Sequence, residues 1–169
     1  REWSAPRASN PCPCGQYGAR DSECTCTPSS RRRYLGRLSG PLLDRIDIQL
    51  RVQRITSAQL KLADDSERLT TSVARERVVA ARTRAAERLS ETPWCVNSQV
   101  PGFWLRGPHA RLSTVVTATI DRALERGGIT MRGYDRVLRL GWTLADLDNA
   151  DSPSADHIGR ALYLRKALS

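Results

Sequence analysis

The fold class that the sequence predicts is mostly α: a fragment of an α/β core, made of one strand, one short helix and a cysteine loop, followed by a four-helix domain. Two observations predict it. Apolar residues recur at helical spacing through most of residues 71–168, and strict alternation of apolar and polar residues is found only at 46–52. Residues 1–29 have neither period and are rich in Pro, Gly, Ser and Cys, so we expect irregular backbone that a metal or a neighbouring domain orders.

Regular structure in the core fragment begins with a short helix over 31–38. Residues 27–30 can cap it, and Ser39-Gly40-Pro41 stops it. The alternating segment 46–52 predicts a half-buried strand. Because a lone strand is not stable as a sheet, this strand needs partner strands from outside the chain.

Four amphipathic helices are predicted after a polar connection: 71–90, 111–126, 131–147 and a last one with Ser152 as N-cap and Pro153 in its first turn. Gly127 and Gly128 end the second of them. These boundaries divide the chain into 1–54, the end of the core with the cysteine loop 10–28; 55–69, a linker; and 70–169, a helical C-terminal domain. The first residues include neither an initiator Met nor an apolar signal segment, so we expect a piece of a longer protein.

Charge indicates an anionic partner. The 169 residues include 27 Lys+Arg and 18 Asp+Glu, for a net charge of +9. Only Lys61 and Lys166 are lysines, so nearly all of the positive charge is guanidinium, which binds phosphate bidentately. No apolar run approaches the roughly 18 residues of a membrane span, so no transmembrane role is expected.

Four of the five cysteines, Cys12, Cys14, Cys24 and Cys26, follow the pattern C-x-C-x9-C-x-C. Two close thiolate pairs joined by a loop can converge on one tetrahedral ion, and a structural zinc ion is the main hypothesis. An iron–sulfur cluster, redox disulfides and no metal at all are the alternatives. Clustered cysteines favour a cytoplasmic protein over a disulfide-stabilised secreted one. Cys95 stands alone and is expected to be a small buried apolar residue.

Two arginine positions have both a functional and a neutral interpretation. Arg45 follows a Pro-containing turn and precedes the predicted strand, where it could reach a neighbouring subunit's phosphate or could belong to a surface ion-pair cluster with Asp44 and Asp47. Arg132 lies in the first turn of the third predicted long helix, where the helix dipole favours phosphate.

Two further basic patterns have the same two interpretations. Arg136 and Arg139 continue from Arg132 on one helix face, which would otherwise be a solvated basic face. The run 31–33 with Tyr34 beside it and Arg37 a turn later could follow a nucleic-acid backbone or could be solvated in the same way.

Two motifs of ATP hydrolysis are missing from the sequence. It contains neither the pattern G-x-x-x-x-G-K-[ST] nor a hydrophobic strand ending in Asp-Glu that could hold Mg²⁺. His109 and His157 are both expected to be solvated rather than catalytic. The chain is therefore not expected to hydrolyse ATP alone.

Five motifs occur in a specific order: Asn-Pro-Cys-Pro-Cys-Gly at 10–15, Cys-x-Cys at 24–26, Tyr-Leu-x-Arg-Leu-Ser-Gly-Pro-Leu-Leu-Asp-Arg-Ile-Asp-Ile at 34–48, Arg-x-Tyr-x-Arg-Val-Leu-Arg at 132–139 and Thr-Leu-Ala-Asp-Leu at 143–147. Together they resemble the C-terminal half of the ComM/YifB group of Mg-chelatase-like AAA+ ATPases. The resemblance covers residues 10–168.

The resemblance implies the end of an AAA+ core and a helical lid from a hexameric ring motor that uses ATP and Mg²⁺, with DNA branch migration in natural competence as its task. By this resemblance, Asn10 corresponds to sensor 1 of the family, the residue that orients the attacking water. Arg45 resembles the arginine finger offered in trans, and Arg132 resembles sensor 2, the lid arginine that contacts nucleotide in its own subunit. The Walker A and Walker B segments of the family lie upstream and are missing here, so hydrolysis would need a partner chain or the upstream part of a longer chain.

Two alternatives to a partial ATPase remain. A non-enzymatic, zinc-stabilised nucleic-acid-binding module needs only the cysteines and the positive charge. A degenerate remnant would have no stable fold.

Overall fold

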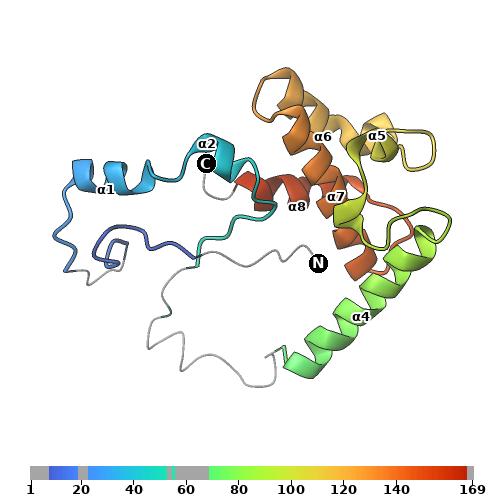
Figure 1. Ribbon diagram of the computed structural model, residues 1–169, viewed down its shortest axis with the longest axis horizontal. Helices are drawn as coiled ribbons and strands as arrows, with labels where there is room; N and C mark the ends of the chain where they lie inside the picture. The colour runs from blue at the N-terminus through green and yellow to red at the C-terminus, as the bar shows by residue number, and fades with distance from the viewer. Residues whose placement is uncertain (1–7, 19–22, 53–54, 56–68, 167–169) are drawn as a thin grey trace. The chain divides into compact units, whose positions relative to one another are not determined.

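The computed structural model describes residues 8–18, 23–52, 55 and 69–166, and the chain divides into two compact units, Arg1–Arg45 and Ile46–Ser169. The first unit contains the cysteine loop, α1 (Pro28–Leu35) and α2 (Gly40–Leu43) (Figure 1). The described residues are mostly helical, as the sequence predicts. Most of the predicted linker 55–69 lies outside the described residues.

Helix α1 is set by its N-cap. Thr27 has extended backbone and its Oγ1 accepts a hydrogen bond from the Ser30 amide, while Pro28 takes the first helical position, where its missing N–H costs nothing. The helix therefore begins three residues before the predicted 31–38 and ends at Leu35. The predicted stop at 39–41 instead begins the short α2, with Ser39 as its N-cap. Neither helix buries a residue.

The second unit is built around α7 (Met131–Leu147). Among the described elements of this unit, α7 packs against α4 (Thr71–Arg88), η2 (Asn97–Gln99), α5 (Gly102–Leu105), α6 (Thr114–Glu125) and α8 (Ala155–Lys166) (Figure 1). The long helices agree with the predicted spans 71–90, 111–126 and 131–147 to within three residues. The short elements η2 and α5 lie in the connection for which the sequence predicted only a loop.

The core of this unit lies between α7 and its neighbours. Ile120, Val137 and Ile158 are fully buried. Each large aliphatic side chain buried in this way contributes about 1.5–3 kcal/mol relative to exposure. A Cβ at Gly141 would lie 2.6 Å from Cδ1 of Ile158, so the glycine lets α8 pack closely against α7. The C-terminal half of α4 joins this core, because Ala81 and Ala85 are buried whereas the valines nearer its start, Val73, Val78 and Val79, are exposed.

The strand predicted over 46–52 is wrong: the described residues of this segment form no strand. Ile48, Leu50 and Val52 are exposed, and the Gln49 amide instead donates a hydrogen bond to the Leu164 carbonyl of α8 at 2.8 Å. The alternation of apolar and polar residues over 46–52 is present in the sequence, but it does not by itself make a strand. A strand additionally needs neighbouring strands to satisfy its backbone groups, and no other described segment supplies one.

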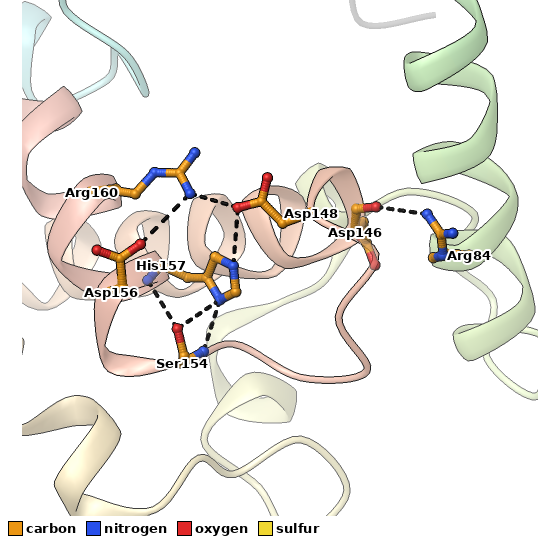
Figure 2. Close-up of polar contacts among 7 residues, drawn as sticks. All are labelled: Arg84, Asp146, Asp148, Ser154, Asp156, His157 and Arg160. Carbon is orange, nitrogen blue, oxygen red and sulfur yellow. Dashed lines mark hydrogen bonds and ion pairs between the residues drawn. The ribbon is translucent and has the colours of Figure 1, made fainter.

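Helix α8 begins later than predicted, at Ala155, because its cap is formed by Ser154 and His157 rather than by Ser152 (Figure 2). The Ser154 amide donates to Nδ1 of His157 at 2.9 Å, and the His157 amide donates to Oγ of Ser154. Since Nδ1 accepts, the ring proton belongs on Nε2, which lies 3.2 Å from a carboxylate oxygen of Asp148. His157 is therefore buried and hydrogen-bonded, and the expectation of a solvated side chain is wrong.

A buried carboxylate joins α4, η2 and α7. The side chain of Asp146 on α7 is 2% exposed and is paired in bidentate fashion with Arg88 of α4, with Nη2 to Oδ2 at 2.9 Å. Nδ2 of Asn97 donates to Oδ2 at 2.7 Å. The Arg88 guanidinium also lies 4.4 Å from the centre of the Trp142 ring, and Arg84 donates to the Asp146 carbonyl at 3.0 Å (Figure 2).

None of the described helices is long and apolar enough to cross a membrane.

Replacing Arg88 by Ala is expected to lower the free energy of unfolding by about 3 kcal/mol, because it leaves a buried carboxylate without its cation. Urea denaturation followed by circular dichroism measures this loss. Arg75→Ala is the matched control, since Arg75 is exposed on the same helix and should change stability by less than about 0.5 kcal/mol. Equal effects of the two variants would contradict the buried ion pair.

The carboxylate of Asp148 gives the fold a small dependence on pH. The Arg160 guanidinium, followed by His157, lowers the pKa of Asp148 below its ordinary value, against a smaller opposing effect of burial. A lowered folded-state pKa stabilises the fold above the unfolded value of about 3.9, and this contribution is lost as pH falls through the folded value.

Asp148→Asn should therefore remove under about 1 kcal/mol at pH 6, because the carboxylate is a third exposed, and less as the pH falls towards 2. Urea midpoints measured from pH 2 to pH 6 test this, with exposed Asp151→Asn as the control. A difference between Asp148→Asn and wild type that grows as the pH falls would contradict the assignment.

Candidate metal centre

The cysteine loop folds back on itself in a tight turn. The Gly15 amide donates to the Cys12 carbonyl at 3.0 Å, and Gly15 has a φ of +76°, a left-handed conformation that favours glycine. Gly18 has a φ of +92° and continues the reversal. The turn allows Cys12 and Cys14 to face the second cysteine pair, which lies just before α1.

The four cysteine sulfur atoms converge on one point. All of them lie within 4.8 Å of one another. The Sγ atom of Cys12 is 3.3 Å from that of Cys14 and 3.8 Å from that of Cys24, and the Cys14 and Cys24 sulfurs are 3.6 Å apart. Cys12 is buried, the second pair is half-buried and Cys14 is exposed. The sequence prediction that Cys12, Cys14, Cys24 and Cys26 form one cluster is confirmed.

The spacing of these sulfur atoms fits a single tetrahedral ion. Four thiolates at the usual Zn–S distance of about 2.3 Å would lie about 3.8 Å from one another, close to the observed separations. A disulfide would need about 2.05 Å, and all four cysteines are free thiols here. With four sulfur donors the coordination would be complete, so such an ion would have a structural role.

The cluster also favours the ionised form of one thiol. Burial opposes ionisation of Cys12, but hydrogen bonds from Cys14, the Tyr17 backbone and the second cysteine pair together outweigh it and lower the pKa of Cys12 to about 6. The pKa of Cys26 is raised to about 11: a backbone hydrogen bond at Cys14 opposes this rise, but the neighbouring thiols and burial outweigh it. A shared negative charge among four sulfur atoms is what a cation would neutralise.

Arg31 links the cysteine loop to α1. Its guanidinium lies 4.1 Å from the centre of the Tyr17 ring and donates through Nη1 to the Cys26 carbonyl at 2.9 Å. The sequence analysis placed Arg31 in a basic run without this role. An arginine five residues after Cys26, the last cysteine of the cluster, with a tyrosine inside the loop, is the signal that could have indicated the contact.

The other predicted site residues have local contacts within the described part of their units. Asn10 is exposed, and its side chain lies beside Gly15, where an added Cβ would be 3.6 Å from Nδ2. Arg45 is exposed and donates to the Pro41 carbonyl at 3.0 Å. Arg132 is exposed in the first turn of α7, in the other unit.

The basic face of α7 differs from both interpretations of the sequence. Arg136 forms an ion pair with Asp47, and Nε of Arg139 donates to the Val100 carbonyl at 2.7 Å. Burial, followed by the charge of Arg136, lowers the pKa of Arg139. The two arginines therefore hold other segments of this unit against α7. The expectation for Cys95 is also wrong, because this residue is exposed.

Sequence reasoning missed the Asp146 network. Asp146 lies among apolar residues on the buried face of α7, and an acidic residue in that position signals a buried charge that needs a cationic partner. The arginines at helical spacing on α4 were the candidates for this cationic partner.

Comparisons with known proteins give the family. The model of the C-terminal part of the magnesium chelatase subunit ChlI matches residues 68–165, and the model of magnesium chelatase subunit ChlI matches residues 5–60. The chain belongs to the Mg-chelatase-like family. The first match covers the helical unit from before α4 almost to the end of α8, and the second covers the cysteine cluster and Arg45.

Three relatives illustrate what this chain is similar to. An uncharacterized protein of Mycobacterium tuberculosis is 40% identical over 159 residues, YifB of Escherichia coli K12 is 31% identical over 166 residues, and the competence protein ComM of Haemophilus influenzae is 30% identical over 158 residues. Each alignment covers 94% of this chain and 30% of the relative, so the chain spans under a third of the length of these proteins.

The sulfur geometry predicts one bound metal ion per chain. Protein purified without chelators should contain about one equivalent of zinc by elemental analysis, and Cys14→Ser should lose it because one of four donors is removed. Cys95→Ser is the matched control: this thiol is exposed outside the cluster and should leave the metal content unchanged. Iron in place of zinc would identify a different ion, and unchanged metal in Cys14→Ser would contradict the site.

Proposed function

We propose that this chain acts as part of a Mg-chelatase-like AAA+ ATPase of the ComM/YifB type, in which it contributes sensor 1, the arginine finger and sensor 2 to ATP hydrolysis in a hexameric motor that processes DNA by branch migration in the cytoplasm. The observation that carries the proposal is the pair of family matches, which together include all three residues. ATP and Mg²⁺ would be bound mainly by a nucleotide-binding segment with Walker motifs, which this sequence does not contain.

The exposure of Arg45 supports the role of arginine finger. Its guanidinium reaches the solvent after the short α2 and makes a hydrogen bond with the Pro41 carbonyl, which uses one of its five N–H groups. The remaining donors can bind the γ-phosphate of ATP on a neighbouring subunit. A finger of this kind stabilises the charge of the transition state and contributes about 10³ to 10⁵ in rate.

The surroundings of Arg132 support the role of sensor 2. Thr130 caps α7 by accepting a hydrogen bond from the Gly133 amide at 3.0 Å, and Arg132 lies in the first turn, where the positive end of the helix dipole favours phosphate. Arg136 and Arg139 are held by Asp47 and the Val100 carbonyl. Of these three arginines on α7, Arg132 is the exposed one.

Asn10 would orient the attacking water, and the cysteine cluster would hold the loop that carries it. The side chain of Asn10 lies beside Gly15 in the turn that brings Cys12 and Cys14 together. A zinc ion on the four thiolates would supply folding free energy to this loop and no catalytic chemistry. The position of the Asn10 amide would then depend on metal binding.

The test of the proposed function combines this chain with the nucleotide-binding half of a ComM-type relative. We expect ATP hydrolysis only in the mixture. Arg45→Ala should lower the rate of hydrolysis by about 10³-fold or more while ATP binding is retained, since a finger acts on the transition state. Exposed Arg126→Ala is the control and should leave the rate unchanged. Loss of ATP binding together with hydrolysis would make Arg45 structural, and an unchanged rate would exclude the finger.

The cysteine cluster beside a basic helix favours a second candidate, a zinc-stabilised nucleic-acid-binding module without enzymatic activity. DNA binding that weakens strongly with salt but does not respond to ATP, in a mixture that fails to hydrolyse ATP, would favour this module over the motor.

A further inference from the structure

Helix α1 contributes nothing to a hydrophobic core. None of its residues is buried, and the side chain of Leu35 is 46% exposed. Three arginines, Arg32, Arg33 and Arg37, are exposed on the helix or just after it, and no acidic residue of the described part of the chain pairs with them. Because α1 packs against so little, these three positive charges do not stabilise the fold through packing or ion pairs.

The cysteine loop fixes α1 through Arg31. The stacking on Tyr17 and the hydrogen bond to the Cys26 carbonyl join the first full turn of α1 to the cluster of sulfur atoms. Thr27, directly after the last cysteine, caps the same helix. Among the described residues of this unit the loop therefore orients α1, and Cys12 of the cluster is the one buried side chain.

We propose that α1, presented by the metal-bound cysteine loop, is a DNA-binding element in which Arg32, Arg33 and Arg37 contact phosphates of the duplex backbone. The inference rests on the proposed function for its partner and its metal, and adds the surface that makes the contact. Guanidinium groups match phosphate bidentately. The described residues of this unit include five arginines and two acidic residues, Glu23 and Asp44, so the local charge attracts a polyanion.

The chemistry of α1 indicates contact with the backbone rather than with the bases. Tyr34 is only partly exposed, and the helix presents no other aromatic side chain for stacking and no Asn or Gln for reading base edges. The binding should therefore be independent of sequence and strongly dependent on salt. Each phosphate neutralised contributes a slope of about −0.9 in log K against log salt, so three contacts contribute about −2.7.

The experiment uses the whole chain loaded with zinc and a fluorescent duplex of about 20 base pairs with random sequence, titrated by anisotropy between 50 and 200 mM salt. The triple variant Arg32→Gln, Arg33→Gln, Arg37→Gln should make the slope shallower by about 2.7 and lower the affinity at 50 mM salt by at least tenfold. The matched control removes the same charge from α4 through Arg75→Gln, Arg77→Gln and Arg82→Gln, three exposed arginines whose loss should change the slope by less than one.

A second triple variant, with lysines at 32, 33 and 37, keeps the charge and should keep the slope. Circular dichroism and zinc content report whether each variant is folded. Removal of the metal, or Arg31→Gln with the metal retained, should weaken binding at least threefold, because α1 is then no longer held by the loop.

Three results would overturn the proposal: wild type without measurable DNA binding at 50 mM salt, a glutamine triple variant on α1 that binds like wild type, or equal losses in the α1 and α4 triple variants, which would indicate a general effect of charge. These outcomes are independent of ATP hydrolysis. A mixture that does not hydrolyse ATP, or an unchanged rate in Arg45→Ala, with the DNA result intact would reject the proposed ATPase role and leave the α1 surface in place.

Discussion

The helical unit depends on the burial of one carboxylate. A charge as deeply buried as Asp146 is tolerated only if cations and hydrogen-bond donors replace its water, and these come from two other elements, α4 and η2. Arg88 brings the C-terminal end of α4 to α7, and Asn97 brings η2 to the same point. Trp142 then packs under the guanidinium of Arg88. The network sets the position of α4 even though only half of that helix reaches the apolar core.

The described residues of the N-terminal unit form no comparable interior. Its helices α1 and α2 bury no residue, so little apolar burial offsets the entropy of ordering their backbone. Convergence of four thiols, a cation–π contact at Tyr17 and side-chain caps take the place of a core. Order in this unit is therefore expected to depend on a ligand, whereas order in the helical unit is intrinsic.

Patterns that depend on local physics were predicted well from the sequence, and patterns that depend on distant partners were not. The spans of α4, α6 and α7 follow from helical periodicity, and the cysteine cluster follows from spacing within one loop. The strand over 46–52 failed because alternation cannot supply neighbouring strands. The roles of His157 and Asp146 were missed because their partners, Asp148 and Arg88, are fixed by folding and not by spacing. The roles of Asn10, Arg45 and Arg132 stay predictions.

The arginines show why charge alone is a weak guide to function. Arg136 was expected to share a phosphate-binding or solvated face with Arg132, but it pairs with Asp47, 89 residues away in sequence. A guanidinium that is held by a carboxylate or a backbone carbonyl of the fold has fewer donors to offer to a ligand. The same criterion separates Arg31, which is occupied by Tyr17 and Cys26, from Arg32 and Arg33, which are not. In a chain rich in arginine, the candidates for function are therefore the arginines whose guanidinium donors are not taken up by contacts within the fold.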